Sequence, residues 1–322
     1  MWRCYDCGAT GEPDGFLATT EALEQHFAET GHKHGMYSYG GHASDRTVVE
    51  VDRGEHTLVD AATWATNKVH TVESLVRRRH TVIDVCQETP DTVSIISDFP
   101  TDWHPGQFSM LSAFTGEVPI SFSGKVGGCT MQTIRKVGRV TSLLTSLQPG
   151  ATITQRGPFG HGWRYQDAHD LLIITGGCGF APLRPVIDDY TGPTTLLYGA
   201  RTGADYLFAE DYACRARPRI GAWDALNLQL ITDEEGFVSD LIKPEYVGPE
   251  TVALICGPER MMKACGDKLV ALGMSPKRIQ VSMERRMLCG IGMCERCSCG
   301  RGRLVCKDGP VFEFAEPIEW EV

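Results

Sequence analysis

Five cysteines lie close together near the end of this 322-residue chain, in the stretch MERRMLCGIGMCERCSCGRGRLVCKDGPVF (residues 283–312). Four of them, Cys289, Cys294, Cys297 and Cys306, follow the spacing C-x4-C-x2-C-x8-C. The first three positions have the plant-type spacing of [2Fe–2S] clusters, whose irons are held by cysteine thiolates. The pattern therefore predicts one [2Fe–2S] cluster. A structural zinc ion is the alternative for four thiolates at this spacing.

A second set of metal-ligand residue types lies near residue 1. Cys4, Cys7, His26 and His32 have the spacing C-x2-C-x18-H-x5-H, and four such ligands can close a tetrahedral shell around Zn²⁺. His34 is an alternative to His32, and surface histidines beside a loose cysteine pair are the alternative to a metal site. Residues 1–35 are too few to build a stable core alone, so we expect a bound zinc ion to stabilise this segment.

The composition is that of an ordinary globular chain, with 42% hydrophobic and 22% charged residues. No run of about 18 apolar residues occurs, and the start MWRCYDCG lacks the pattern of a secretory signal. We therefore expect a cytoplasmic protein without a membrane partner, in a reducing compartment, which the odd number of 13 cysteines without an export signal favours. A formal net charge of −10 is opposite to the basic surface that nucleic-acid binding needs, so we expect no nucleic-acid partner.

The sequence predicts a multidomain chain that positions these cysteines. Short strand-like segments separated by turns, from about residue 80 to 163, predict a small β-barrel. From residue 170 apolar strands alternate with helical connections, which predicts a doubly wound α/β domain. The predicted order begins with a zinc-finger-like segment (1–35) and a linker with one strand and a connecting helix (36–78). The barrel (79–165), the α/β domain (166–280) and a [2Fe–2S]-binding segment (281–322) follow.

A glycine-rich turn lies at the start of the α/β domain, in IITGGCGFAPLRPVI (residues 173–187). Gly176, Gly177 and Gly179 fall between a predicted strand and a predicted helix. Glycines there let the backbone approach a pyrophosphate at the helix N-terminus, and a plain tight turn is the alternative. The turn is a candidate dinucleotide site.

Two later strands of the same domain end in residues that suit a nicotinamide dinucleotide. LLYGAR ends in Arg201, where a 2′-phosphate would favour NADP(H), whereas Asp205 nearby suits the free ribose hydroxyl of NAD(H). LICGPERMM contains Cys256, which we expect beside the nicotinamide ring rather than as a nucleophile. The alternative is that Cys256 is a small buried apolar residue.

These elements, in this order after a small barrel, resemble the ferredoxin–NADP reductase family. The resemblance implies FAD in the barrel, NAD(P)H in the α/β domain and hydride transfer between stacked rings, with RGPFG (residues 156–160) as the turn between the two domains. Val118 stands where many members have an arginine, so other groups must hold the flavin phosphates. The implied FAD contacts are Pro119, Ile120, Ser121, Gly138, Val140 and Thr141, and the implied nucleotide contacts are Gly176, Gly177, Gly179, Ala181, Pro182, Arg201, Gly257 and Pro258.

The cysteine segment behind such a module resembles electron-transfer subunits of multi-subunit redox enzymes. These include the gamma subunit of cytosolic NAD(P)-linked [NiFe] hydrogenases (sulfhydrogenases), the dihydroorotate dehydrogenase electron-transfer subunit and the corresponding subunit of anaerobic sulfite reductase. The short x8 interval and Val118 favour the hydrogenase type. The resemblance implies electron flow between NAD(P)H, FAD, the [2Fe–2S] cluster and a partner subunit. A zinc-bearing regulatory or scaffold protein on an inactive reductase fold is the alternative of another class.

The proposed zinc site has a direct test in the full-length protein. We expect about one zinc ion per chain, which a Cys4→Ser, Cys7→Ser double variant loses because two of four ligands are gone. Elemental analysis of both proteins, with Cys86→Ser as a control for the loss of an isolated thiol, measures this. Zinc that persists in the double variant, or is absent from the unaltered protein, contradicts the assignment.

Overall fold

The computed structural model describes residues 2–4, 10–11, 34–39, 47–52, 55–60, 75–112, 116–208, 228–231 and 236–321 of the chain. The chain divides into two compact units, residues 1–76 and 77–322. Among the described residues, no helix has the length and apolar character needed to cross a bilayer.

The N-terminal unit contains an antiparallel sheet of five strands in the order β2-β1-β3-β4-β5. Strand β3 crosses the boundary expected after residue 35, and the hairpin of β4 and β5 occupies the segment expected to be a linker with a single strand. Valine and threonine are frequent in this hairpin, and both residue types favour extended backbone. The strands are β1 (Trp2–Cys4), β2 (Thr10–Gly11), β3 (His34–Tyr39), β4 (Thr47–Asp52) and β5 (Glu55–Asp60).

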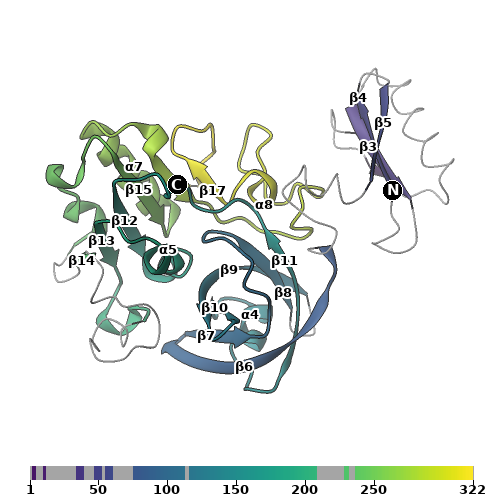
Figure 1. The fold of residues 1–322 in the computed structure, drawn as a ribbon, viewed down its shortest axis with the longest axis horizontal. Helices are drawn as coiled ribbons and strands as arrows, with labels where there is room; N and C mark the ends of the chain where they lie inside the picture. Colours follow the sequence, from purple (N-terminus) through teal and green to yellow (C-terminus); the bar gives the residue numbers. More distant parts are fainter. Residues whose placement is uncertain are drawn as a thin grey trace. The chain divides into compact units, whose positions relative to one another are not determined.

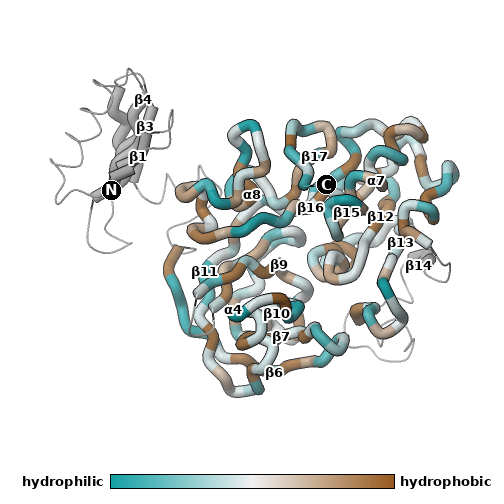
Figure 2. The backbone as a smooth tube through the Cα atoms, turned by 180° about the vertical axis from the view of Figure 1, so that it is seen from behind, coloured by the Kyte–Doolittle hydropathy of each residue, from teal (hydrophilic) through white to brown (hydrophobic). Residues whose placement is uncertain are grey.

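The predicted barrel is confirmed as a closed barrel of six antiparallel strands in the order β10-β7-β6-β11-β8-β9 (Figure 1). Hydrophobic and hydrophilic residues are interspersed along its strands (Figure 2), and β7 and β8 are buried over most of their length. A short helix, α4 (Arg139–Leu144), packs against β9 and β10. The strands are β6 (Arg78–Thr89), β7 (Thr92–Ser97), β8 (Phe108–Ser112), β9 (Glu117–Val126), β10 (Cys129–Arg135) and β11 (Thr152–Phe159).

The α/β half is a six-stranded sheet in the order β14-β13-β12-β15-β16-β17 (Figure 1). Five strands are parallel, as predicted, but β17 runs antiparallel to β16, so the sheet is mixed. The reason is that the chain leaves the sheet after β16, forms the cysteine segment and returns in the opposite direction. The strands are β12 (Asp170–Gly176), β13 (Thr194–Gly199), β14 (Leu228–Ile231), β15 (Thr251–Cys256), β16 (Ile279–Ser282) and β17 (Val311–Glu313).

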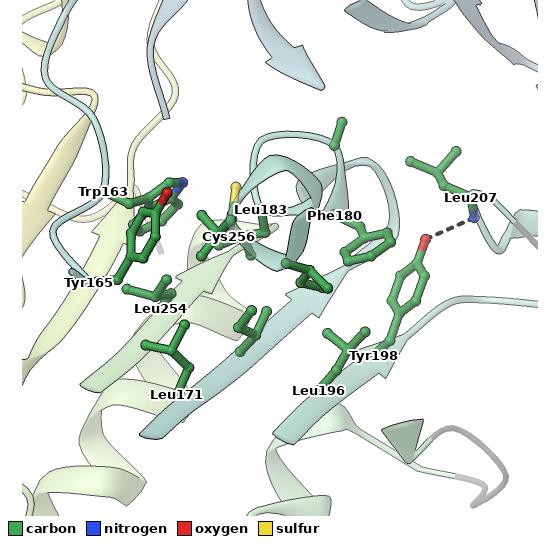
Figure 3. Close-up of a cluster of buried hydrophobic side chains, with 14 of the residues drawn as sticks. Trp163, Tyr165, Leu171, Phe180, Leu183, Leu196, Tyr198, Leu207, Leu254 and Cys256 are labelled. Atoms are coloured by element: carbon green, nitrogen blue, oxygen red, sulfur yellow. Dashed lines mark hydrogen bonds between the residues drawn. The ribbon is translucent and has the colours of Figure 1, made fainter. Parts of the chain in front are cut away.

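The core of this half lies where the central strands meet the segments that follow β12. Leu171, Leu196 and Leu254 project from three adjacent strands toward Phe180 and Leu183 (Figure 3). Among the described residues, this half includes the helices α5 (Arg184–Asp189), which contacts β9 of the barrel, and α7 (Glu259–Ala271), which contacts β15. The apolar run of β12 is thus fully used in packing, which fixes the position of the glycine turn at its end.

Candidate functional site

The glycine turn follows β12 directly, as a 3-10 helix η2 (Gly177–Phe180). Gly177 has a φ of +53°, in the left-handed region that glycine adopts at little cost. A Cβ added at Gly179 would lie 2.3 Å from the carbonyl oxygen of Cys256, so only glycine fits between the turn and the end of β15. The sequence therefore places η2 against the neighbouring parallel strand, at the edge where α/β sheets bind ligands.

A cleft of about 1080 Å³ opens at this edge of the sheet. It lies where the strand order reverses, between β12 and β15, which is the expected ligand position of an open parallel sheet. Of the predicted nucleotide contacts, the cleft is lined by Gly176, Gly177, Gly179, Arg201, Gly257 and Pro258.

Ala181 and Pro182 are the two predicted nucleotide contacts that do not line the cleft. Ala181 is buried, and its N–H donates to the carbonyl of Cys178 at 3.1 Å. The carbonyl of Pro182 accepts a hydrogen bond from the indole N–H of Trp163 at 3.0 Å. Both residues therefore contact the protein interior next to the glycine turn and do not face the cleft.

The barrel also lines the cleft, which the sequence did not indicate. Arg135, at the end of β10, donates from Nε to Oδ2 of Asp91 at 2.9 Å, and Asp91 also accepts from the hydroxyl of Thr92. The carboxylate of Asp91 offsets the positive charge of the guanidinium on this wall of the cleft. No local pattern marks these residues, since they reach the cleft only through the packing of the two halves.

Two other cleft residues escaped the sequence analysis. Phe237 is 79% exposed on the cleft, directly after Gly236. Glu284 lines the cleft just after β16. An aromatic residue after a glycine beyond a predicted parallel strand is a usable signal for Phe237, because ligands bind at that edge of the sheet.

Arg201 lies on the cleft, beyond the end of β13, and is 71% exposed at its side chain. Its Nη2 donates to Oδ1 of Asp205 at 3.2 Å, and the hydroxyl of Thr202 donates to the other carboxylate oxygen at 2.9 Å. Arg201, which favours NADP(H), and Asp205, which suits NAD(H), therefore form an ion pair with each other. A 2′-phosphate would have to compete with Asp205 for the guanidinium.

Cys256, the predicted neighbour of the nicotinamide, is the last residue of β15 and is 2% exposed. It does not line the cleft. Burial, followed by the nearby Glu284 carboxylate, raises the pKa of its thiol. A protonated buried thiol suits packing and not nucleophilic attack, and its role beside a nicotinamide ring stays a prediction.

The predicted flavin segment lies on β9, where Pro119, Ile120 and Ser121 are each half-buried. Val118, in the position of the missing arginine, packs with Ile120 and Val140 against the apolar core of the barrel. This segment of the barrel thus leaves half-covered surface beside the start of α4, which fits a bound flavin better than a closed barrel wall would.

The predicted phosphate site at the start of α4 is partly occupied by its own chain. The hydroxyl of Thr141 accepts hydrogen bonds from the N–H groups of Val137 and Gly138, both at 2.9 Å. The first N–H groups of a helix have no partner within it, so those of residues 139–141 are the ones left to bind phosphate. The amide of Gly138 and the hydroxyl of Thr141 are therefore used within the turn, whereas the amides of residues 139–141 face the predicted phosphate site.

The four cluster cysteines lie in the segment between β16 and β17, which includes a short helix α8 (Val305–Asp308). The sulfurs of Cys297 and Cys306 are 3.2 Å apart, and Cys306 also exchanges a hydrogen bond with Cys289. Cys294, the exposed member, donates its backbone N–H to the sulfur of Cys289 at 3.4 Å. Among the described residues no group of three or more His, Cys, Asp or Glu side chains is arranged to hold a single metal ion.

Backbone N–H groups point at these sulfurs. The N–H groups of Ile291 and Met293 donate to the sulfur of Cys289 at 3.5 and 3.3 Å, and that of Gly292 donates to Cys306 at 3.0 Å. The glycines at 290 and 292 both have positive φ, which lets the loop fold around the sulfurs. Such donors favour negatively charged sulfur, so the loop fits an anionic iron–sulfur cluster.

Hydrogen bonds between the cysteine side chains shift the pKa values of their thiols. A hydrogen bond from Cys306 lowers the pKa of Cys289 to about 4, and one from Cys306 lowers the pKa of Cys297 to about 7. The pKa of Cys306 itself is raised because its proton is shared with those two sulfurs. Cys299, in contrast, is buried with its pKa raised to about 11, and its sulfur contacts the carbonyl of Arg303. Cys299 is set apart from the predicted ligands because its sulfur contacts a backbone carbonyl, whereas the sulfurs of Cys289, Cys297 and Cys306 contact one another.

The predicted zinc ligands are described only at Cys4. It is the last residue of β1 and pairs with Gly35 of β3, the residue after His34. Cys7, His26 and His32 lie outside the described residues. The zinc site therefore stays a prediction.

Comparison with known protein families gives two matches. The family model of the iron–sulfur cluster binding domain of dihydroorotate dehydrogenase B matches residues 284–316, which contain all four predicted cluster ligands. The model of the oxidoreductase NAD-binding domain matches residues 173–267, which run from β12 into α7.

Two relatives are similar over most of their length. Sulfhydrogenase 1 subunit gamma of Pyrococcus furiosus is 37% identical over 235 residues, covering 66% of this chain and 80% of the relative. A probable dihydroorotate dehydrogenase B (NAD(+)) electron transfer subunit of Thermoplasma volcanium is 33% identical over 233 residues, covering 72% and 87%.

Solved structures share the fold. A chain from a structure of NADH-dependent reduced ferredoxin-NADP oxidoreductase has a TM-score of 0.62 at 24% identity, covering 75% of this chain and 90% of that one. The flavohemoglobin of Malassezia yamatoensis, solved with bound FAD and heme, has a TM-score of 0.53 at 18% identity, covering 63% and 59%.

The cluster ligands are tested by comparing two buried cysteines. We expect Cys306→Ser to lose or alter the EPR signal of the reduced cluster, because a hydroxyl is a poorer iron ligand than a thiolate. Cys299→Ser, two residues after Cys297 and also buried, should leave the signal unchanged. An unaltered signal in Cys306→Ser, or a lost one in Cys299→Ser, contradicts the ligand set.

Proposed function

Since the chain belongs to the family of electron-transfer subunits that includes sulfhydrogenase subunit gamma and the dihydroorotate dehydrogenase B electron transfer subunit, we propose that it carries electrons between NAD(P)H, FAD and a [2Fe–2S] cluster, to or from a partner redox subunit. The observation that carries the proposal is the cysteine loop. It extends from the sheet whose cleft fits a dinucleotide, and it packs on the barrel whose strand β9 fits a flavin.

Each group has a set of residues that would hold it. The half-covered segment of β9 and the start of α4 hold FAD, the cleft at the ends of β12, β13 and β15 holds NAD(P)H, and the four cysteines hold the cluster. When bound, the flavin accepts a hydride from the nucleotide and exchanges single electrons with the cluster. The protein's contribution is orientation: the glycine turn admits the dinucleotide, and the packed core behind it holds that turn in one place.

The partner we propose is a [NiFe] hydrogenase assembly in the cytoplasm. The gamma subunit of a sulfhydrogenase is 37% identical to this chain, and Val118 together with the short interval before Cys306 supports that type. A dihydroorotate dehydrogenase or sulfite reductase complex is the second candidate, and the family match at residues 284–316 supports the dihydroorotate dehydrogenase form of it. The alternative of another class is a zinc-bearing scaffold on an inactive fold.

The proposal is tested by the absorption spectrum of the protein purified without oxygen. We expect flavin and iron–sulfur bands together, both bleached on addition of reduced nucleotide. A colourless protein supports the scaffold alternative and contradicts the proposal. Flavin bands without iron–sulfur bands, in protein whose iron content is also nil, contradict the cluster part alone.

Nucleotide choice is tested at Arg201, where we propose that a 2′-phosphate binds. Replacing Arg201 by Ala removes a charge-assisted hydrogen bond, so KM for NADPH is expected to rise about 10-fold or more while KM for NADH changes little. Steady-state reduction of an artificial acceptor measures both. Lys263→Ala is the matched control, because Lys263 forms a similar i,i+4 ion pair with Asp267 outside the cleft. A strong preference for NADH that Arg201→Ala leaves untouched contradicts NADP(H) as the nucleotide.

A further inference from the structure

Arg156, on β11, is buried with 8% of its side chain exposed, and its guanidinium joins two elements far apart in the sequence. Nη2 lies 2.8 Å from Oε2 of Glu117, and Nε donates to the same carboxylate at 3.1 Å. On its other side, Nη1 donates to the carbonyl of Cys289 at 2.6 Å and Nη2 to that of Leu288 at 3.1 Å. One planar fork therefore binds the barrel and the cysteine loop at once.

Each of the two partners of Arg156 lies at or beside a predicted cofactor site. Glu117 is the first residue of β9, two residues before the predicted flavin segment at 119–121. Cys289 is the first predicted cluster ligand. The guanidinium thus connects the strand that fits the flavin with the peptide that carries a cluster ligand.

The loop is also packed directly on the barrel at this point. A Cβ at Gly290 would lie 3.1 Å from Cγ of Met110 and 3.4 Å from the ring of Phe159. The guanidinium of Arg156 lies over the same Phe159 ring, 5.3 Å from its centre. The loop and the barrel touch here, so a change at Arg156 acts on the loop itself.

The carbonyl groups that Arg156 binds belong to the peptides just before the sulfur-binding amides. Holding the carbonyl of Cys289 fixes the rotation of the backbone from which the N–H groups of Ile291 and Met293 reach the sulfur of Cys289. Hydrogen bonds to sulfur set the reduction potential of an iron–sulfur cluster, and more of them favour the reduced form.

Charge alone does not account for this arrangement. The carboxylate of Glu117 is 9% exposed and neutralises the guanidinium, and Arg77 adds a second cation at 2.9 Å from the exposed side. Replacing a buried ion pair by apolar residues often costs no stability, so such a pair is better explained by the geometry it enforces.

We propose that Arg156 is a positioning residue: its planar fork ties the flavin strand to the first cluster ligand and so sets both the potential of the cluster and the rate at which it exchanges electrons with the flavin. This inference rests on the proposed function. It goes beyond it by naming the contact that couples the two redox groups.

The test compares Arg156→Lys, which keeps the charge and loses the fork, with Arg77→Gln, which removes a cation from the same carboxylate without touching the loop. In Arg156→Lys the EPR-monitored midpoint potential of the cluster is expected to fall, and its reduction by nucleotide to slow by about 10- to 100-fold, the usual range for outer-sphere partners of a metal site. Hydrogen exchange at the amides of residues 290–294 is expected to accelerate relative to that of β12. Arg77→Gln is expected to match the unaltered protein in all three.

A wild-type potential, rate and exchange pattern in Arg156→Lys overturns the inference. If Arg156→Lys does not fold, Glu117→Gln serves instead, since it weakens the fork from the barrel side: faster exchange confined to residues 290–294 supports the inference and unchanged exchange overturns it. Unaltered protein that binds neither flavin nor iron defeats the proposed function, which is a separate outcome.

Discussion

The buried fork of Arg156 is the contact on which the cysteine loop depends. It is made by residues that are 39 and 133 positions apart from it in the sequence, and both sides are satisfied by hydrogen bonds. Removing one partner of such a buried pair costs about 3–5 kcal/mol, because it leaves a charge without compensation. The shape of the loop is determined by this contact together with the hydrogen bonds from its amides to the cysteine sulfurs and the sheet strands β16 and β17 at its ends.

The nucleotide half is tied to the barrel by a comparable interaction. Arg184, the first residue of α5, is fully buried and donates from Nη1 to the carbonyl of Ser123 on β9 at 3.1 Å. Its guanidinium lies over the ring of Phe208. The backbone N–H of Phe208 in turn donates to the carboxylate of Glu88 in the barrel. Through these contacts the glycine turn, just before α5, and the flavin segment, just before Ser123, are held in one framework. Hydride transfer requires such fixed orientation far more than it requires an acid or a base.

The sequence predicted what depends on local spacing. The cysteine pattern, the glycine turn after an apolar strand and the rhythm of short strands each reflect a constraint within a few residues, and the barrel, the parallel strands and the cysteine segment are present as expected. It did not predict what depends on distant packing. Arg135 and Asp91 enter the cleft from the barrel, β17 pairs antiparallel after the cysteine loop, and Arg156 bonds a carbonyl on a segment with no local relation to it. Ala181 and Pro182 were expected at the cleft from the family resemblance, and Cys256 from its place at the end of a strand. All three are buried beside the residues that line the cleft, and the role of Cys256 stays a prediction.

The central claim is that the flavin and the cluster form one electron path fed by the nucleotide. An anaerobic titration with reduced nucleotide, followed by flavin absorbance and by the EPR signal of the cluster, tests it most directly. FAD takes two electrons and the cluster one, so reduction is expected to end at about 1.5 equivalents of nucleotide per chain, with both signals developing. An end point at about one equivalent, with the flavin bleached and the cluster silent in EPR, contradicts it.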